Sequence, residues 1–329
     1  MSPDLSALRH RTEQVNDIEI HAVEMGNGPL VLLVHGFPES WYSWRHQLVA
    51  LAEAGHRAVA IDVRGYGGST SPPMVEDYRM LRHVADNVAL VEALGEESAV
   101  IIGHDWGAPI AWTSAQLRPD IFRAVAGLSV PFTPSGRTRP TDGFAKMGDG
   151  DEFYISLFQE PGRAEVEIED DVRRWLLGMY FTASGEGVIA AKKAGLPPSM
   201  FIAPGGRMRD RFVLPEAMPS WLSEEDLDFY VAEFSRSGFT GPLNRYRNVD
   251  RDWEDLAAFS SRPIEVPALF IGGHLDGPTR VGAKAVARFE KTLPRLHDSV
   301  ILPGCGHWVQ QERPDDVNAK LLEFLATLG

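Results

Sequence analysis

The sequence predicts an α/β protein in which a mostly parallel central sheet is flanked by helices and interrupted by a helical insertion. Short apolar runs alternate with helical patterns over residues 1–131, and the same alternation returns over residues 251–329. Between these segments, residues 132–250 carry helical patterns and frequent proline and glycine, with few strand patterns. We therefore expect an α/β core made of the two outer segments and a helical lid made of the middle one.

The first half of the core begins with two strand patterns. Ile18 to Val23 alternates in polarity as a half-exposed strand does, and a turn at Gly26 to Pro29 leads into a buried strand at Leu30 to Val34. The elements expected next are a helix at Trp44 to Ala54, a strand at Arg57 to Ile61, a glycine-rich loop at Arg64 to Ser69 and an amphipathic helix at about Asp77 to Leu94. Because strands alternate with helices, the sheet should be parallel with right-handed crossovers.

The alternation continues on both sides of the insertion. The apolar run Ala99 to Ile102 predicts a fully buried parallel strand, and Ala108 to Leu117 predicts the helix that follows it. The remaining core elements are expected around Val125 and Leu128, and at Ala268 to Gly272, Val281 to Leu293, Val300 to Leu302 and Pro314 to Leu328. Within the insertion, one predicted helix has an apolar face formed by Val172, Trp175, Leu176, Met179 and Tyr180.

The composition indicates an ordinary globular protein, with 44% hydrophobic and 24% charged residues among 329. The net charge of −14 argues against nucleic acid or an anionic membrane as a partner. The single cysteine, Cys305, excludes an internal disulfide and indicates a reducing compartment. Since there is no apolar run of signal-peptide length near the N-terminus and none that approaches the ~18 residues of a membrane span, we expect a cytoplasmic protein.

A tight turn in "VIIGHDWGAPIAW", residues 100–112, carries Asp105 at its apex between Gly103 and Gly107. The pattern has the form of the nucleophile elbow of α/β-hydrolases, a strained turn between a strand and a helix whose apex residue is usually serine. The glycines fit this form because a side chain on either flank would collide with the neighbouring strand or helix. Taken alone, a purely structural turn explains the spacing equally well.

Two further residues follow their own strands in the order that a catalytic triad of this fold requires. The acid is Asp276 in "HLDGP", and the histidine is His307 in "PGCGHW". Because the carboxyl ends of parallel strands share one edge of a sheet, both should lie near Asp105. Singly, Asp276 could cap a helix and His307 could be a loop residue, but their position and order together favour a triad. His274 is the rival histidine, although it precedes the acid.

An aspartate at the apex indicates displacement at a saturated carbon, because a carboxylate is a poor acylating group but forms an alkyl ester with an sp³ carbon. The substrate should therefore be an epoxide or an alkyl halide. His307, oriented by Asp276, would activate the water that cleaves the ester. Backbone N–H groups of Phe37 and Trp106 would hold the resulting oxyanion. No histidine pair has metal-ligand spacing together with a suitable carboxylate, so we expect no metal, and the reaction needs no cofactor.

The chain resembles the epoxide hydrolases of the α/β-hydrolase fold, and is most similar to their bacterial and soluble forms. The segments that carry the resemblance are "HGFPESWYSWRHQ", "DVRGYGGS", "GHDWGAPIAW", "SVPF", "FYISLFQEPGRAE", "SGFTGPLNRYRN", "PALFIGG" and "GCGHWVQQERP". They extend over nearly the whole chain from Pro29 onward. The resemblance implies two lid tyrosines that donate hydrogen bonds to the epoxide oxygen, and the matching segments place them at Tyr154 and Tyr246. Either tyrosine alone would also be explained by packing.

The resemblance further implies an apolar substrate pocket walled by Phe37, Trp106 and Trp308, with a cis bond between Phe37 and Pro38. Aromatic packing alone would also explain Trp308. Two stretches depart from the family pattern. "HLDGPTR" lacks the apolar residues that commonly follow the family's acid, and Gly195 to Gly206 matches no family segment, which leaves the lid shape undefined.

Two other functions are compatible with the sequence. Haloalkane dehalogenases use the same aspartate chemistry, but they commonly carry Asn in the place of Phe37 and lack the tyrosine pair. A non-enzymatic receptor on this fold would bind a small molecule without turnover. The tyrosines favour epoxide opening, because an oxirane oxygen stays in the product and must be protonated, whereas a halide leaves as an anion. The physiological epoxide and the presence of a homodimer are left open.

Overall fold

The computed structural model describes residues 3–197 and 199–329, and its centre is an eight-stranded sheet in the order β1-β2-β4-β3-β5-β6-β9-β10. β1 pairs antiparallel with β2 and β2 with β4, while every other pairing is parallel. This confirms the predicted mostly parallel sheet. The strands are β1 Arg9–Val15, β2 Ile18–Met25, β3 Leu30–Val34, β4 Arg57–Ile61, β5 Ala99–His104, β6 Phe122–Leu128, β9 Ala268–Gly273 and β10 Leu296–Leu302.

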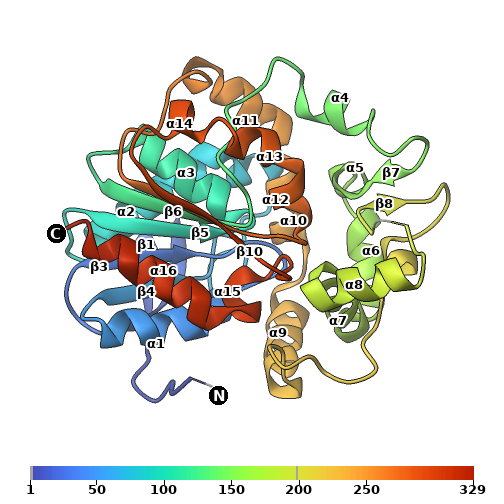
Figure 1. The fold of residues 1–329 in the computed structure, drawn as a ribbon, viewed down its shortest axis with the longest axis horizontal. Helices are drawn as coiled ribbons and strands as arrows, with labels where there is room; N and C mark the ends of the chain where they lie inside the picture. Colours follow the sequence, from blue (N-terminus) through green and yellow to red (C-terminus); the bar gives the residue numbers. More distant parts are fainter. Residues whose placement is uncertain (1–2, 198) are drawn as a thin grey trace.

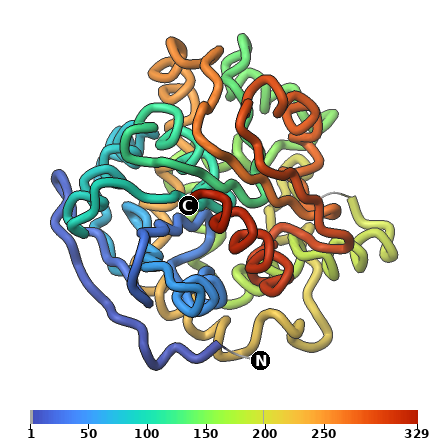
Figure 2. Tube along the Cα trace, turned by 60° about the vertical axis from the view of Figure 1, so that its left-hand side comes forward, coloured from blue at the N-terminus to red at the C-terminus, as the bar shows by residue number. Residues whose placement is uncertain are grey.

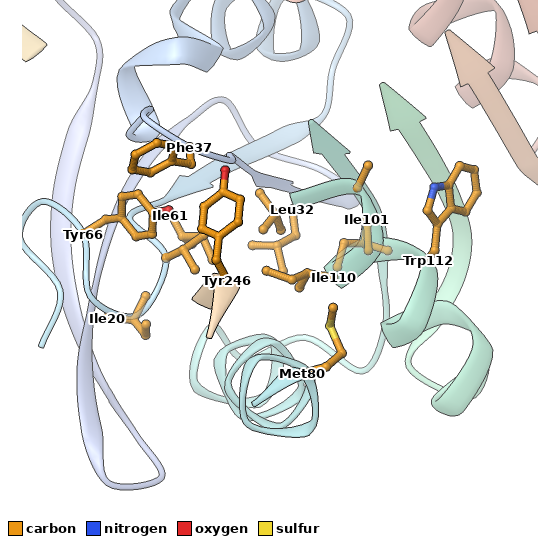
Figure 3. Close-up of a cluster of buried hydrophobic side chains, with 14 of the residues drawn as sticks. Ile20, Leu32, Phe37, Ile61, Tyr66, Met80, Ile101, Ile110, Trp112 and Tyr246 are labelled. Carbon is orange, nitrogen blue, oxygen red and sulfur yellow. The ribbon is translucent and has the colours of Figure 1, made fainter. Parts of the chain in front are cut away.

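Helices cover both faces of the sheet (Figure 1). Because successive side chains of a strand point to opposite faces, Leu32 packs in one hydrophobic cluster and Leu33 in the other. The cluster of Leu32, shown in Figure 3, includes side chains from α2 and α3. The cluster of Leu33 includes side chains from α1 and α16. These helices are α1 Arg45–Glu53, α2 Met80–Ala93, α3 Gly107–Leu117 and α16 Pro314–Ala326.

The chain between β6 and β9 is mainly helical, as predicted for the lid. Helices α5 to α8 lie to one side of the sheet, and both chain ends lie on the side of the core (Figures 1 and 2). The predicted lid limits at residues 132 and 250 stay a prediction. The elements are α4 Pro140–Phe144, β7 Glu152–Phe153, α5 Tyr154–Gln159, α6 Arg163–Asp170, α7 Val172–Ala183, α8 Gly185–Lys193, β8 Phe201–Ile202, α9 Glu224–Ser237, α10 Thr240–Tyr246 and α11 Val249–Asp255.

Three parts of the core differ from the sequence prediction. Strand β1 was not predicted, because its residues are mostly polar and exposed and form no apolar pattern in the sequence. The core element expected at Val281 to Leu293 is helical but divided: this segment holds the end of α12 Gly277–Val281 and the short helices α13 Ala283–Val286 and α14 Phe289–Thr292. The helix expected from Asp77 is a 3₁₀ turn at Val75–Tyr78 followed by α2, since Arg79 is extended between them.

The unmatched stretch from Gly195 to Gly206 contains Pro198, which lies outside the described residues. The same stretch contains β8, which pairs antiparallel with β7, the strand directly before α5. No described helix is long and apolar enough to cross a membrane.

Candidate active site

Asp105 stands at the turn between β5 and α3 with a φ of +49°, in the left-handed region that residues other than glycine rarely adopt. Both flanking glycines are required by space. A Cβ on Gly103 would lie 1.9 Å from the carbonyl oxygen of Gly107, and a Cβ on Gly107 would lie 2.0 Å from that of Val34. The predicted turn between strand and helix is therefore confirmed, and it presents a carboxylate at its apex.

The structure brings the three predicted triad residues together. Nδ1 of His307 lies 2.9 Å from Oδ1 of Asp276, and Nε2 lies 3.4 Å from Oδ2 of Asp105. Asp276 is fully buried and also caps the start of α12, so this carboxylate both orients the imidazole and caps a helix. The rival histidine, His274, is exposed, and its N–H bonds the carbonyl of Leu302.

The charge of His307 depends on both carboxylates. Burial acts to lower the pKa of His307, but the charge of Asp276 and the hydrogen bonds with Asp105 and Asp276 outweigh burial and raise the pKa well above its ordinary value. The imidazole is therefore held as a cation while Asp105 is ionised. Any reaction that neutralises Asp105 removes part of this support and lowers the pKa of His307.

One oxygen of Asp105 is held by the loop that follows β3. The N–H of Phe37 donates a 2.8 Å hydrogen bond to Oδ1 of Asp105. The loop can come this close because residue 36 is glycine, where a Cβ would lie 2.3 Å from the same oxygen. The bond between Phe37 and Pro38 is cis, as the resemblance implied. The second predicted donor, the N–H of Trp106, lies directly before α3, and its part in an oxyanion hole stays a prediction.

The two predicted lid tyrosines lie close to each other and to the nucleophile loop. Tyr154 is the first residue of α5 and Tyr246 the last residue of α10, and their ring centroids are 6.3 Å apart. The ring of Tyr246 packs edge-on against Phe37 at 5.4 Å and Trp106 at 5.1 Å, and Figure 3 shows it beside Phe37. Burial, with the negative charge of Asp105 added, raises the pKa of Tyr154, so its phenol is protonated at neutral pH.

Tyr246 is in the same protonation state. Burial raises its pKa well above the ordinary value, and the neighbouring Tyr154 and Asp105 act in the same direction. The main chain fixes both tyrosines: the N–H of Tyr154 bonds the carbonyl of Met200, and the carbonyl of Tyr246 accepts from the side chain of Gln159. The structure therefore brings together two protonated phenols from segments 92 residues apart in sequence, 154 and 246, and their role as proton donors stays a prediction.

The other predicted pocket residues differ in exposure. Trp106 is half-buried, with the guanidinium of Arg245 4.6 Å above its ring. Pro38 is buried, and its carbonyl accepts a hydrogen bond from Tyr180. Trp308 is fully buried, and its ring centroid lies 4.6 Å from that of His307. Its indole N–H donates to the backbone carbonyl of Tyr180, so aromatic packing alone also explains this residue. Contact of these three residues with substrate stays a prediction.

Sequence reasoning missed Glu39, a buried carboxylate that connects the loop after β3 with the end of β5 and with Gln310. Glu39 accepts from the N–H of Gly36 at 3.0 Å, lies 2.7 Å from Nδ1 of His104 and accepts from Gln310 at 2.9 Å. The other ring nitrogen of His104 lies 2.8 Å from the carbonyl of His307. One ring nitrogen of His104 thus contacts loop backbone, and the carboxylate partner of the other was not foreseen. A charged residue five positions after the end of the buried strand β3 was the available signal.

Sequence reasoning also missed Ser129 and Thr279, whose hydroxyls contact the acid of the triad. Neither hydroxyl has a recognisable motif, since serine and threonine are common in loops. The ring of His35 contacts loop backbone at both nitrogens: Nδ1 lies 2.8 Å from the carbonyl oxygen of Gly36, and Nε2 lies 3.0 Å from the backbone nitrogen of Val63.

Comparisons with known proteins identify the class first. Residues 29–169 match the family described as alpha/beta hydrolase fold, so the sheet and its apex aspartate define an α/β hydrolase. Epoxide hydrolase B of Mycobacterium tuberculosis is 45% identical over 350 residues, which cover 97% of this chain and 98% of the relative.

Solved structures give the same family. An epoxide hydrolase from an endophytic Streptomyces has a TM-score of 0.95 and 58% identity, covering 98% of this chain and 96% of that one. Epoxide Hydrolase A from Mycobacterium thermoresistibile has a TM-score of 0.89 and 44% identity, covering 97% and 98%. The chain belongs to the epoxide hydrolases, a family of enzymes.

Proposed function

We propose that the protein converts an epoxide and water to a vicinal diol through a covalent alkyl ester on Asp105, which His307 and Asp276 then hydrolyse. The observation that carries the proposal is the contact of His307 with both carboxylates, together with the protonated phenols of Tyr154 and Tyr246, the second of which packs against Phe37 and Trp106. The proposed reaction uses side chains and water alone.

In the first step, Asp105 attacks one ring carbon of the epoxide. The N–H of Phe37 holds Oδ1, so Oδ2 is the oxygen available for attack. As the new C–O bond forms, the ring C–O bond breaks, and the released oxygen takes a proton from Tyr154 or Tyr246. The backbone N–H groups of Phe37 and Trp106 then surround the ester carbonyl, where negative charge develops in the next step.

In the second step, water attacks the carboxyl carbon of the ester. Alkylation has removed the negative charge of Asp105, so the pKa of His307 falls and the neutral imidazole can take a proton from the water. Asp276 stabilises the imidazolium that forms. The acyl C–O bond then breaks, and the oxygen that Asp105 supplied leaves with the diol after it takes a proton from His307. Asp105 is left as a carboxylic acid, and its proton returns to the phenolate.

The runner-up reaction is dehalogenation of an alkyl halide by the same aspartate. A halide leaves as an anion and needs no proton, so two protonated tyrosines beside Asp105 favour the epoxide. A receptor without turnover would need neither an oriented base nor proton donors. The cytoplasmic location stays a prediction, and the presence of a homodimer stays open.

The test is diol formation by the purified protein from styrene oxide and from a fatty-acid epoxide, with bromide release from a bromoalkane measured in parallel. We expect diol without bromide, and no diol from the Asp105→Ala variant. Bromide without diol would assign the protein to dehalogenation. Neither product from a folded protein would contradict the proposed enzyme reaction with these substrates.

A further inference from the structure

The second oxygen of the triad acid is held by two buried hydroxyl groups. Oδ1 of Asp276 faces His307, whereas Oδ2 accepts from the hydroxyl of Ser129 at 2.7 Å and from that of Thr279 at 2.6 Å. The backbone N–H of Thr279 is a third donor to Oδ2, at 3.2 Å. Asp276 and Ser129 are fully buried and Thr279 is nearly so, which leaves little access for water.

Ser129 is held in this place by a strained main chain. It follows the last residue of β6 with a φ of +69°, a left-handed conformation that serine rarely adopts. Its N–H bonds the carbonyl of Ile271 in β9 at 2.9 Å, so the sheet ladder fixes the conformation. Its hydroxyl oxygen also lies 3.0 Å from Nδ1 of His307, and the one hydroxyl therefore contacts both partners of the Asp276–His307 pair.

Thr279 holds the same carboxylate from α12, whereas Ser129 holds it from the end of β6. It lies in the first turn of α12, and its hydroxyl is 2.8 Å from the carbonyl oxygen of Ser129 as well as close to Asp276. Space for this side chain depends on glycine at position 272, where a Cβ would lie 2.6 Å from Oγ1 of Thr279. Thr279 lies in "HLDGPTR", the segment that departs from the family pattern after its acid.

We propose that Ser129 and Thr279 are positioning residues that act through Asp276 and are needed for only the second step of the reaction. Hydrogen bonds from hydroxyl groups stabilise a carboxylate in its charged form and fix its rotation. With Oδ2 fixed, Oδ1 stays directed at Nδ1 of His307, so Nε2 faces the ester. The inference rests on the proposed function, because His307 acts in ester hydrolysis and not in the attack by Asp105.

The test separates the two steps in Ser129→Ala, Thr279→Val and the double variant. Rapid mixing of excess purified full-length protein with styrene oxide, followed by acid quench, gives the rate of ester formation by intact mass and the rate of diol release by chromatography. We expect the rate of ester formation to stay within about twofold of that of the parent protein. Each substitution removes a hydrogen bond from a hydroxyl group to a charged carboxylate, and should slow ester hydrolysis about tenfold or more. The hydrolysis rate should also change its pH profile, because the base is less well supported.

Thr279→Ser is the matched control, since it keeps the hydroxyl and loses only a methyl group. We expect it to hydrolyse the ester at nearly the parental rate. Parental hydrolysis in a folded double variant would overturn the inference, and so would equal slowing of both steps, which would indicate a general structural role. If the parent protein forms neither ester nor diol, the proposed function itself fails. This outcome can be told apart from failure of the inference, because it is seen in the protein without any substitution.

Discussion

Nε2 of His307 lies 3.4 Å from Oδ2 of Asp105, so the base directly faces the carboxylate whose ester it is proposed to hydrolyse. The contact has opposite consequences before and after alkylation. An ionised Asp105 favours the imidazolium, whereas an esterified Asp105 carries no charge and favours the neutral base. In the proposed reaction, the nucleophile therefore controls the protonation of the base that regenerates it.

This coupling predicts that Asp105→Asn lowers the pKa of His307. Burial remains and Asp276 remains, but one of the two neighbouring negative charges is lost. Titration of the imidazole signals by NMR in the parent protein and the variant measures the difference. An unchanged pKa would mean that Asp276 alone sets the charge of His307.

The same coupling fixes the sign of the pH dependence of ester hydrolysis. The step needs neutral His307, so its rate should fall as the pH falls through the pKa that His307 has in the ester. Ester formation does not use His307 as a base, so its rate should not follow this pH dependence. Single-turnover measurements from pH 5 to 9 give both rates; a hydrolysis rate that rises toward acid would contradict the assignment of His307 as the base.

Replacing His307 with glutamine should stop the reaction at the ester. General-base catalysis contributes about 10²- to 10⁴-fold, so hydrolysis should slow by that order while Asp105 still attacks. Intact mass spectrometry after addition of styrene oxide should then show a protein heavier by one substrate molecule. As a control, a variant with both Asp105→Ala and His307→Gln should show no added mass.

In the proposed reaction, Tyr154 and Tyr246 act in ester formation, whereas His307 acts in ester hydrolysis. Tyr154→Phe and Tyr246→Phe should each slow ester formation, because one of two donors to the epoxide oxygen is lost, and the double variant should form no diol. Thermal unfolding compares the fold of each variant with the parent, since both rings are packed among aromatic side chains. Unchanged turnover in the folded double variant would exclude the tyrosines as proton donors.

Glu39 is predicted to matter for stability. Burial acts to raise its pKa, but the charge and hydrogen bond of His104 and the N–H of Gly36 outweigh burial and lower the pKa to about 2. Glu39→Gln should therefore lower the free energy of unfolding at pH 7 by about 1.5–3 kcal/mol, the usual contribution of hydrogen bonds to a charged group.

The pH dependence of this loss has a defined sign. A carboxyl group with a lowered pKa in the folded protein stabilises it above the unfolded pKa, and this contribution disappears as the pH falls through about 2. The difference in stability between the parent protein and Glu39→Gln should therefore shrink below about pH 4. Denaturant unfolding at a series of pH values measures the difference, and a constant difference would contradict the ionised state of Glu39.

The sequence predicted those parts of the fold and site that depend on local pattern. The turn at Asp105 follows from its two glycines, and the order of Asp105, Asp276 and His307 follows from strands that share one edge. Strand β1 was not predictable in this way, because its polar residues form a strand through pairing with β2. The partners Glu39 and Ser129 were missed for a related reason: their significance depends on contacts with residues 65 and 147 positions away along the chain, His104 and Asp276.

The central claim, a covalent ester on Asp105, is tested most directly by one turnover in water labelled with the heavy oxygen isotope. Protein in excess over styrene oxide should release a first diol without label, because its new oxygen comes from Asp105, while the label enters the carboxylate of Asp105 and is found in the peptide that contains it. Labelled diol from the first turnover, with an unlabelled peptide, would mean that water attacks the epoxide directly and would contradict the account.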